Sequence, residues 1–201
     1  MTTVISASRR TDLIAFFPDW LAAALRSRRA RVLGPRGRIR EVSLAPEEVH
    51  TVVLWSKDFS NLLRNTLGLR DLLAAYGQLY LHFTVTGLGG TDLEPGVAPA
   101  DVALSQLEGL VEVVGDPRRV SLRVDPIVFW REGAAVRSNL AFVETAARRA
   151  AEAGLVDLRF SIAQWYTKAK NRAARRRFPF VDPADEEKFR AALTVAAAAE
   201  A

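Results

Sequence analysis

The chain has 201 residues, of which 49% are hydrophobic and 25% charged, and it contains no cysteine. These proportions are typical of a globular protein, and they exclude a disulfide framework and a metal site built on thiolates. No stretch reaches the roughly 18 apolar residues that a membrane span needs, and the start, MTTVISASRR, lacks the basic-then-apolar order of a signal peptide. We therefore expect a protein of a bacterial cytoplasm, without membrane contact and with a single domain over residues 1–201.

Short segments rich in β-branched and aromatic residues recur along the chain, and each is too short for a helix. The predicted strands are residues 4–8, 49–55, 79–85, 120–124 and 155–162. Helical patterns follow them: one after Pro18, one from Ser60, and three more over residues 99–115, 138–154 and 182–201. This alternation of strand and helix is typical of βαβ units in a parallel sheet.

Alternate residues of a strand face opposite sides of its sheet. Tyr80, His82 and Thr84 share one face, while the residues between them are apolar. Polar residues alternate in the same way in three further sets: Ser6, Ser8 and Arg10; Ser121, Arg123 and Asp125; Arg159 and Ser161. Sheets with helices on both faces usually have apolar strands, so a polar face favours a barrel lumen.

A dinucleotide-binding fold is not favoured, because SRRTD stands after the first strand in place of a glycine fingerprint. Five βα units do not close an eight-stranded barrel. We therefore predict the α/β class, with repeated βα units that form an open or partial TIM-like barrel, incomplete at its C-terminal end.

Polar and charged residues follow the predicted strands, and the C-terminal ends of parallel strands form the active-site edge of such folds. The stretches concerned are SRRTD (8–12), WSKD (55–58), TVTG (84–87), RVDPI (123–127) and QWYTKAKN (164–171). From them we predict six ligand-binding residues: Arg9, Arg10, Asp12, Lys57, Arg123 and Asp125.

The predicted ligand is an anionic small molecule or cofactor. The cations would clamp its carboxylate or phosphate group, and the aspartates would orient the cations or accept hydrogen bonds from an amine or a ribose hydroxyl. The alternative is an internal salt-bridge network in which Arg123 pairs with Asp125 or Asp12. No residue is assigned as a catalytic acid, base or radical relay.

We predict no metal site from the residues of this chain. His50 and His82 are its two histidines, and neither has a second ligand at a metal-binding spacing. Trp55, Trp165 and Tyr166 lie at or beyond strand ends, where they either stack on a planar ligand or pack against the protein.

Arginines are concentrated at residues 26–40 and 172–178. These runs are explained by solvated helix faces. The alternative function is a nucleic-acid-binding protein whose arginine-rich surfaces contact a phosphate backbone, with Arg28, Arg29, Arg175 and Arg176 as the contacts. A further alternative is a barrel without a metal cluster that only binds small molecules.

Four motifs, in this order, resemble those of the bacterial family called domain of unknown function 1848: ISASRRTD, VLWSKD, FTVTGLGGTDLEPGVAP and RVDPI. The resemblance covers nearly the whole chain. It implies the open barrel of a radical S-adenosylmethionine enzyme, with a C-x-x-x-C-x-x-C cluster near the C-terminus. That cluster would hold a [4Fe–4S] centre that splits S-adenosylmethionine to form a radical.

The chain departs from this pattern because it has no cysteine and ends in AAAAEA. It therefore supports no iron–sulfur cluster by itself; S-adenosylmethionine and [4Fe–4S] are implied for a full-length form. We expect it to be the N-terminal, cofactor- and substrate-binding portion of a longer protein, or a natural form without radical chemistry.

Overall fold

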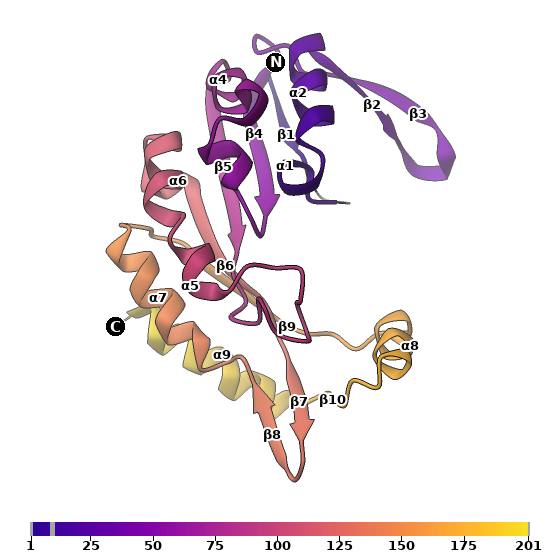
Figure 1. Cartoon of the computed structure of the whole chain (residues 1–201), viewed down its shortest axis with the longest axis vertical. Coiled ribbons are helices and arrows are strands. Elements are labelled where there is room, and N and C mark those ends of the chain that lie inside the picture. Colours follow the sequence, from indigo (N-terminus) through magenta and orange to yellow (C-terminus); the bar gives the residue numbers. More distant parts are fainter. Residues whose placement is uncertain (1, 9–10, 201) are drawn as a thin grey trace. The chain divides into compact units, whose positions relative to one another are not determined.

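The computed structural model describes residues 2–8 and 11–200. The chain forms two compact units, whose course is drawn in Figure 1. Unit 1 comprises Met1–Phe83 and Ser105–Ser121, and unit 2 comprises Thr84–Leu104 and Leu122–Ala201. Within the described ranges, no helix is both long and apolar enough to cross a membrane.

All the predicted strands are present and belong to one sheet, in the order β1-β4-β5-β6-β9. Their bounds are β1 (Thr3–Ser6), β4 (Val49–Ser56), β5 (Gln78–Thr84), β6 (Val120–Ile127) and β9 (Leu158–Ile162). The pairs β1/β4, β4/β5 and β6/β9 are parallel. The mixed α/β class is therefore confirmed. The row has two ends, β1 and β9, so the sheet is open in the part of the chain that the structure describes.

Helices of unit 1 bury leucine and isoleucine side chains against its strands. The elements are α1 (Leu13–Phe16), α2 (Pro18–Ser27), α3 (Ser60–Leu63), α4 (Leu69–Ala74) and α6 (Leu107–Val114), with the 3-10 turns η1 (Pro35–Gly37), η2 (Thr66–Gly68) and η3 (Pro117–Arg119). Ile14, Leu62 and Phe59 are fully buried, and the Phe59 ring meets Phe83 of β5 edge-on.

The helix predicted from Ser60 is interrupted, which corrects its predicted extent. Asn65, Leu67 and Gly68 have positive φ angles of 53°, 56° and 70°. The Asn65 side chain accepts a hydrogen bond from the Arg70 backbone N–H at 2.9 Å, so this polar residue stabilises a turn where leucine spacing suggested a continuous helix.

In unit 2, α7 packs against α9, and α9 contacts β9. The helices are α5 (Ala100–Leu104), α7 (Phe142–Glu152), α8 (Thr167–Arg175) and α9 (Asp185–Glu200), and a second sheet contains β7 (Phe129–Glu132), β8 (Ala135–Ser138) and β10 (Phe180–Val181). The predicted helices at 99–115, 138–154 and 182–201 correspond to α5 with α6, α7 and α9.

The arginine run at residues 26–40 is not a helix face beyond residue 28, and the helical interpretation of it is wrong. It forms an antiparallel hairpin of β2 (Arg29–Leu33) and β3 (Ile39–Ser43). Gly37, with φ of 74°, turns the chain between the strands. Exposed arginines suit either a helix or a strand, so their presence alone did not decide between the two.

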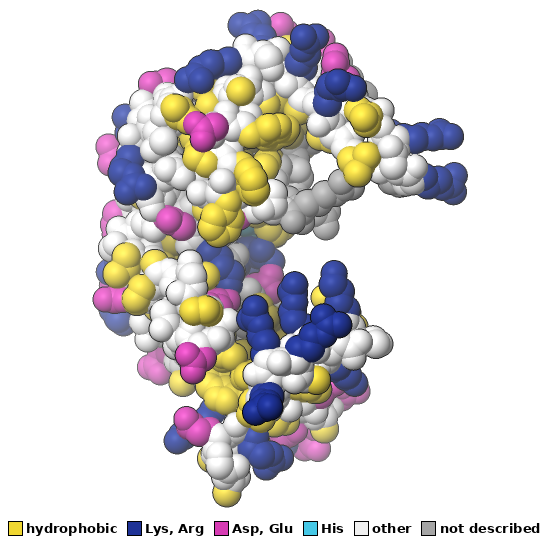
Figure 2. Space-filling view, turned by 45° about the vertical axis from the view of Figure 1, so that its right-hand side comes forward, with side chains coloured by type: hydrophobic (Ala, Val, Ile, Leu, Met, Phe, Trp, Pro, Cys, Tyr) yellow, Lys and Arg dark blue, Asp and Glu magenta, His cyan; other side chains and the backbone are white. Residues whose placement is uncertain are grey.

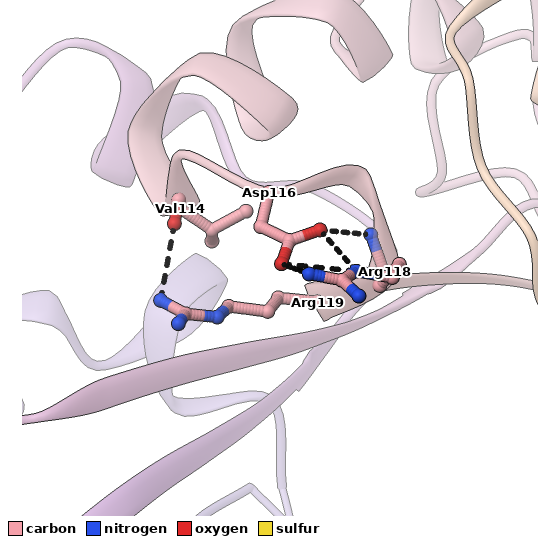
Figure 3. A network of polar contacts seen from close by, with 4 residues as sticks. All are labelled: Val114, Asp116, Arg118 and Arg119. Carbon is pink, nitrogen blue, oxygen red and sulfur yellow. Dashed lines mark hydrogen bonds and ion pairs between the residues drawn. The ribbon is translucent and has the colours of Figure 1, made fainter.

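A charged turn leads from α6 into β6 (Figure 3). Asp116 accepts a hydrogen bond from the Arg118 backbone N–H at 2.9 Å and pairs with the Arg118 guanidinium at 2.8 Å. Hydrogen bonding to Arg118 lowers the pKa of Asp116 to about 2. Arg119 reaches back to the Val114 carbonyl at 3.5 Å. These contacts order the turn at the N-terminal end of β6, away from the strand ends that carry the predicted site.

Candidate functional site

The first polar cluster lies at the C-terminal ends of β1 and β4 in unit 1 and is centred on Asp12. Its carboxylate accepts a hydrogen bond from the Ala15 N–H at 3.1 Å, which caps α1. The other carboxylate oxygen accepts from the Ser56 hydroxyl at 2.7 Å and from the Lys57 N–H at 3.1 Å. The structure therefore brings together two of the predicted residues, Asp12 and Lys57, through the Lys57 backbone.

Asp58 lies next to this cluster and has a separate set of donors. One of its oxygens accepts hydrogen bonds from the Ser60 N–H at 2.8 Å, from the Ser60 hydroxyl, and from the Gln106 amide at 3.1 Å. Gln106 in turn accepts from the Phe59 N–H at 2.8 Å. Asp58 was not among the predicted site residues, although the WSKD motif contains it.

The two aspartates differ in their proton affinity. Burial is the largest influence on both and raises the pKa of each. For Asp12 burial prevails over the hydrogen bonds, and the pKa is raised above its ordinary value of 3.8. For Asp58 the hydrogen bonds from Ser60 and Gln106 together outweigh burial, and the pKa is lowered. Asp12 is thus the carboxyl of the pair that holds a proton more readily.

This difference predicts opposite effects of pH on stability. A raised pKa in the folded state means that folding favours the protonated form of Asp12, so its contribution is present below 3.8 and is lost as pH rises through the raised pKa. The contribution of Asp58 is present above 3.8 and is lost as pH falls through its lowered pKa. Urea unfolding of wild type, Asp12→Asn and Asp58→Asn between about pH 2.5 and pH 6 checks this. The stability difference between wild type and Asp12→Asn should fall with rising pH, and that for Asp58→Asn should rise. Equal slopes would contradict the assignment.

A row of rings covers one face of the unit 1 strands. The Trp55 indole N–H donates to the Ser6 hydroxyl at 3.1 Å, and the Trp55 ring stacks on His82 with centroids 3.9 Å apart. Tyr80 contacts the same imidazole at 5.1 Å. His82 is 5% exposed, so this face combines polar atoms with packed rings. The residues predicted to form a polar face therefore do lie together, although aromatic packing buries much of that face.

A second polar cluster lies at the C-terminal ends of β6 and β9 in unit 2. The Arg123 guanidinium forms an ion pair with Asp125, whose other oxygen accepts a hydrogen bond from the Ser161 hydroxyl. The side chains of Arg123 and Asp125 are 20% and 24% exposed. The pairing of Arg123 with Asp125 is the contact that the salt-bridge alternative specifies, and it holds the guanidinium beside a carboxylate. Arg9 and Arg10 lie outside the described residues.

A pocket of about 510 Å³ lies beyond the C-terminal end of β9 in unit 2. Its walls come from the segment that follows β5 and from α8 with the residues after it: Asp92, Leu93, Trp165, Tyr166, Lys168, Ala169, Arg172, Ala173, Arg176, Arg177, Phe178 and Pro179. Four of these are cations and one is an acid. Lys and Arg side chains gather on the surface around α8 (Figure 2).

Aromatic packing shapes this pocket. Trp165 stacks on Phe180 with centroids 4.1 Å apart and contacts Phe178 at 6.1 Å. The backbone N–H of Phe178 donates to the Ala173 carbonyl at 2.9 Å, which folds the chain back at the end of α8. The Trp165 indole nitrogen is buried and has no hydrogen-bond partner among the described residues. Such an atom costs about 1–3 kcal/mol, so a bound acceptor here would be favourable.

The pocket brings together two stretches that sequence analysis considered separately, QWYTKAKN and the arginine run at 172–178. The reversal of the chain at Phe178 makes them neighbours, and no residue pattern specified that reversal. The aromatic residues Trp165, Phe178 and Phe180 were the one available indication of a shared cluster.

A family model described as domain of unknown function (DUF1848) matches residues 4–201. The chain belongs to the DUF1848 family. Neither a curated protein nor a solved structure matches it. The match confirms the family that the four motifs resemble, and it includes every described residue of the two polar clusters and of the pocket.

The residues present do not fit an iron–sulfur cluster, since the chain has no cysteine. Residues 2–8 and 11–200 also contain no group of three or more histidine, aspartate or glutamate side chains placed to hold a metal ion. The chemistry that this chain can supply is therefore hydrogen bonding, charge and ring stacking at the ends of its strands.

Proposed function

We propose that the chain binds an organic anion that carries a planar ring, at the C-terminal ends of its parallel strands. The observation that supports this is the pocket after β9, where Lys168, Arg172, Arg176 and Arg177 surround the ring edges of Trp165 and its aromatic neighbours. Arginine binds carboxylate and phosphate through paired N–H groups, and an aromatic wall stacks on a planar ring. The volume is in the range of small-molecule sites.

The six predicted residues remain ligand-binding proposals. In unit 1 the Lys57 ammonium would attract an anionic group while Asp12 fixes the Lys57 backbone. In unit 2 Asp125 would orient the Arg123 guanidinium toward a ligand, with Ser161 holding Asp125 in place. Arg9 and Arg10 immediately precede the Asp12 region of the sequence.

The family resemblance supports a finer proposal. The open sheet would be part of an open or partial TIM-like barrel that binds cofactor and substrate in a radical S-adenosylmethionine enzyme, with cysteines from outside this chain holding the cluster. The carboxylate and purine ring of S-adenosylmethionine suit an arginine and aromatic lining. The binding experiment below therefore includes this molecule.

Adenosine monophosphate is the first ligand to test, because it combines a ring with a phosphate. We expect it to quench tryptophan fluorescence with an affinity that falls at least about tenfold in Arg172→Gln/Arg176→Gln, the loss of charge-assisted hydrogen bonds worth about 1.5–3 kcal/mol each. The matched control Arg137→Gln/Arg190→Gln removes the same charge from exposed positions of unit 2 and should bind like wild type. Adenosine, inorganic phosphate and S-adenosylmethionine separate the contributions of ring, anion and cofactor. If none of the four ligands binds, the proposal is wrong.

Arg123→Ala separates ligand binding from a purely structural ion pair. On the proposed function the variant stays folded and its affinity for adenosine monophosphate or S-adenosylmethionine falls at least about tenfold. Loss of thermal stability with unchanged affinity would instead show that Arg123 only stabilises Asp125. Thermal melts and titrations on the same samples give both quantities.

A further inference from the structure

An arginine-rich hairpin in unit 1 contributes nothing to the pocket after β9. β2 and β3 form a separate two-stranded antiparallel sheet, which extends away from α2 and β1 in Figure 1. Residues 29–43 contain five arginines and a single acidic residue, Glu41. A charge this one-sided on an isolated ribbon calls for a partner or a solvent role.

The hairpin is anchored at its base only. Ala30 is buried and packs with Ala24 and Leu44, and Val42 lies against this group. The Leu44 N–H donates to the Arg28 carbonyl at 2.8 Å. Beyond this base, residues 31–33 and 36–41 are exposed. A fixed base with an exposed outer half presents the ribbon to a partner in a defined direction.

The arginines occupy both faces of the ribbon and its tip. Arg31 lies opposite Glu41 on one face, and Arg40 lies opposite Val32 on the other. Arg36 and Arg38 lie at the turn. None of these four arginines forms an ion pair within residues 2–8 and 11–200. Their charges are therefore available to an external anion.

A small apolar step separates the tip from the rest of the ribbon. Leu33 and Ile39 are paired across the strands and are 55% and 61% exposed. Exposed aliphatic side chains of this kind pack against sugars and base edges when a ribbon enters a nucleic acid groove.

We propose that the β2–β3 hairpin is an arm that enters a groove of duplex DNA. A two-stranded ribbon fits the major groove, which is about 12 Å wide, and five paired residues extend this one by about 16 Å. Arg31 and Arg40 then face the phosphates on either side, and the tip arginines reach into the groove. Arginine forms the paired hydrogen bonds that phosphate and guanine accept.

The position of the tip arginines favours a duplex over a lipid surface. A hairpin that inserts into a membrane places its apolar residues foremost, with cations behind them at the headgroups. Here Arg36 and Arg38 lie beyond Leu33 and Ile39, so they would have to enter hydrocarbon first, at a high energetic cost.

Fluorescence anisotropy with a labelled DNA duplex of about 20 base pairs tests the proposal, at NaCl concentrations from about 50 to 200 mM. Wild type should bind with a steep salt dependence. The variant Arg31→Gln/Arg36→Gln/Arg38→Gln/Arg40→Gln should lose at least about tenfold in affinity, and its salt slope should fall by up to about 3–4, near 0.9 for each lost phosphate contact. The control Arg118→Gln/Arg137→Gln/Arg148→Gln/Arg190→Gln removes the same charge elsewhere and should stay within about twofold of wild type.

A second variant keeps the test valid if the first does not fold. Arg36→Gln/Arg38→Gln changes two exposed side chains and should lose part of the affinity with an unchanged thermal melt. Equal losses in the hairpin and control variants would show a net-charge effect and overturn the proposal. So would the absence of duplex binding, tighter binding to a single strand of the same length, or a hairpin-dependent preference for phosphatidylserine vesicles over DNA.

Discussion

Replacing Asn139 with aspartate is expected to lower the free energy of unfolding by about 4 kcal/mol at neutral pH. Asn139 is 6% exposed, and its amide N–H₂ donates to the Thr86 carbonyl at 2.8 Å and to the Pro126 carbonyl at 3.2 Å. Its side-chain oxygen accepts from the Val128 N–H at 2.8 Å. The substitution keeps the shape but directs a buried carboxylate oxygen at two carbonyl oxygens, so two hydrogen bonds are replaced by repulsion.

Denaturant unfolding of Asn139→Asp measures this loss, and pH provides an internal check. Burial favours the neutral form of the introduced carboxyl, so its protonation as pH falls should restore one donor and reduce the difference from wild type. Asn171→Asp is the matched control, because Asn171 is exposed on α8 and the same change there should cost less than about 0.5 kcal/mol. A variant at Asn139 as stable as wild type would mean that the three contacts contribute nothing to holding these loops together.

Gly89→Ala is the substitution with the next largest expected effect. A Cβ at this position would lie 1.9 Å from the Ala98 carbonyl oxygen, far inside van der Waals contact. The loop has little freedom to move away, since the Gly90 N–H donates to the Glu94 carbonyl at 3.1 Å and the Glu94 carboxylate accepts from the Thr86 hydroxyl at 2.6 Å. We expect a loss of about 2–4 kcal/mol and a fall in Tm of about 5–15 °C.

Gly96→Ala provides the control within the same loop, because nothing lies within 4 Å of a Cβ there. It should leave Tm within about 2 °C of wild type. Limited proteolysis of both variants shows whether the damage is local, with cleavage of residues 88–98 expected in Gly89→Ala alone. If the two alanine variants melt together, the backbone approach at Ala98 is looser than the structure has it.

The strands were predictable because their physical requirements are local. Runs such as VHTVVLWS and QLYLHFT combine β-branched, aromatic and aliphatic residues over the length of one strand, and tertiary packing agrees with that preference. The interrupted helix after Ser60 was not predictable from leucine spacing, since the decisive feature is the turn made by the Asn65 side chain. The β2–β3 hairpin was missed because RARVL and IREVS alternate only weakly between apolar and charged residues.

Part of the candidate site followed from the rule that parallel strands end at one edge. That rule placed Asp12 beside Lys57, and Arg123 beside Asp125, within their respective units. It did not find Ser161 or Gln106 as hydrogen-bond partners, because a serine or a glutamine has no pattern that announces its role. The pocket after β9 depends on a reversal of the chain that arises from packing of rings around Trp165.

The β2–β3 hairpin also has a consequence for the solution behaviour of the protein. Two strands that pair only with each other leave outward N–H and C=O groups on which a strand of another molecule can form, the first step of edge-to-edge aggregation. Arginines spread over the ribbon oppose this, since two like-charged hairpins repel before their backbones meet. The same side chains thus act as gatekeepers. Samples in which they are neutralised should be kept dilute, and their monodispersity should be verified by light scattering before any titration.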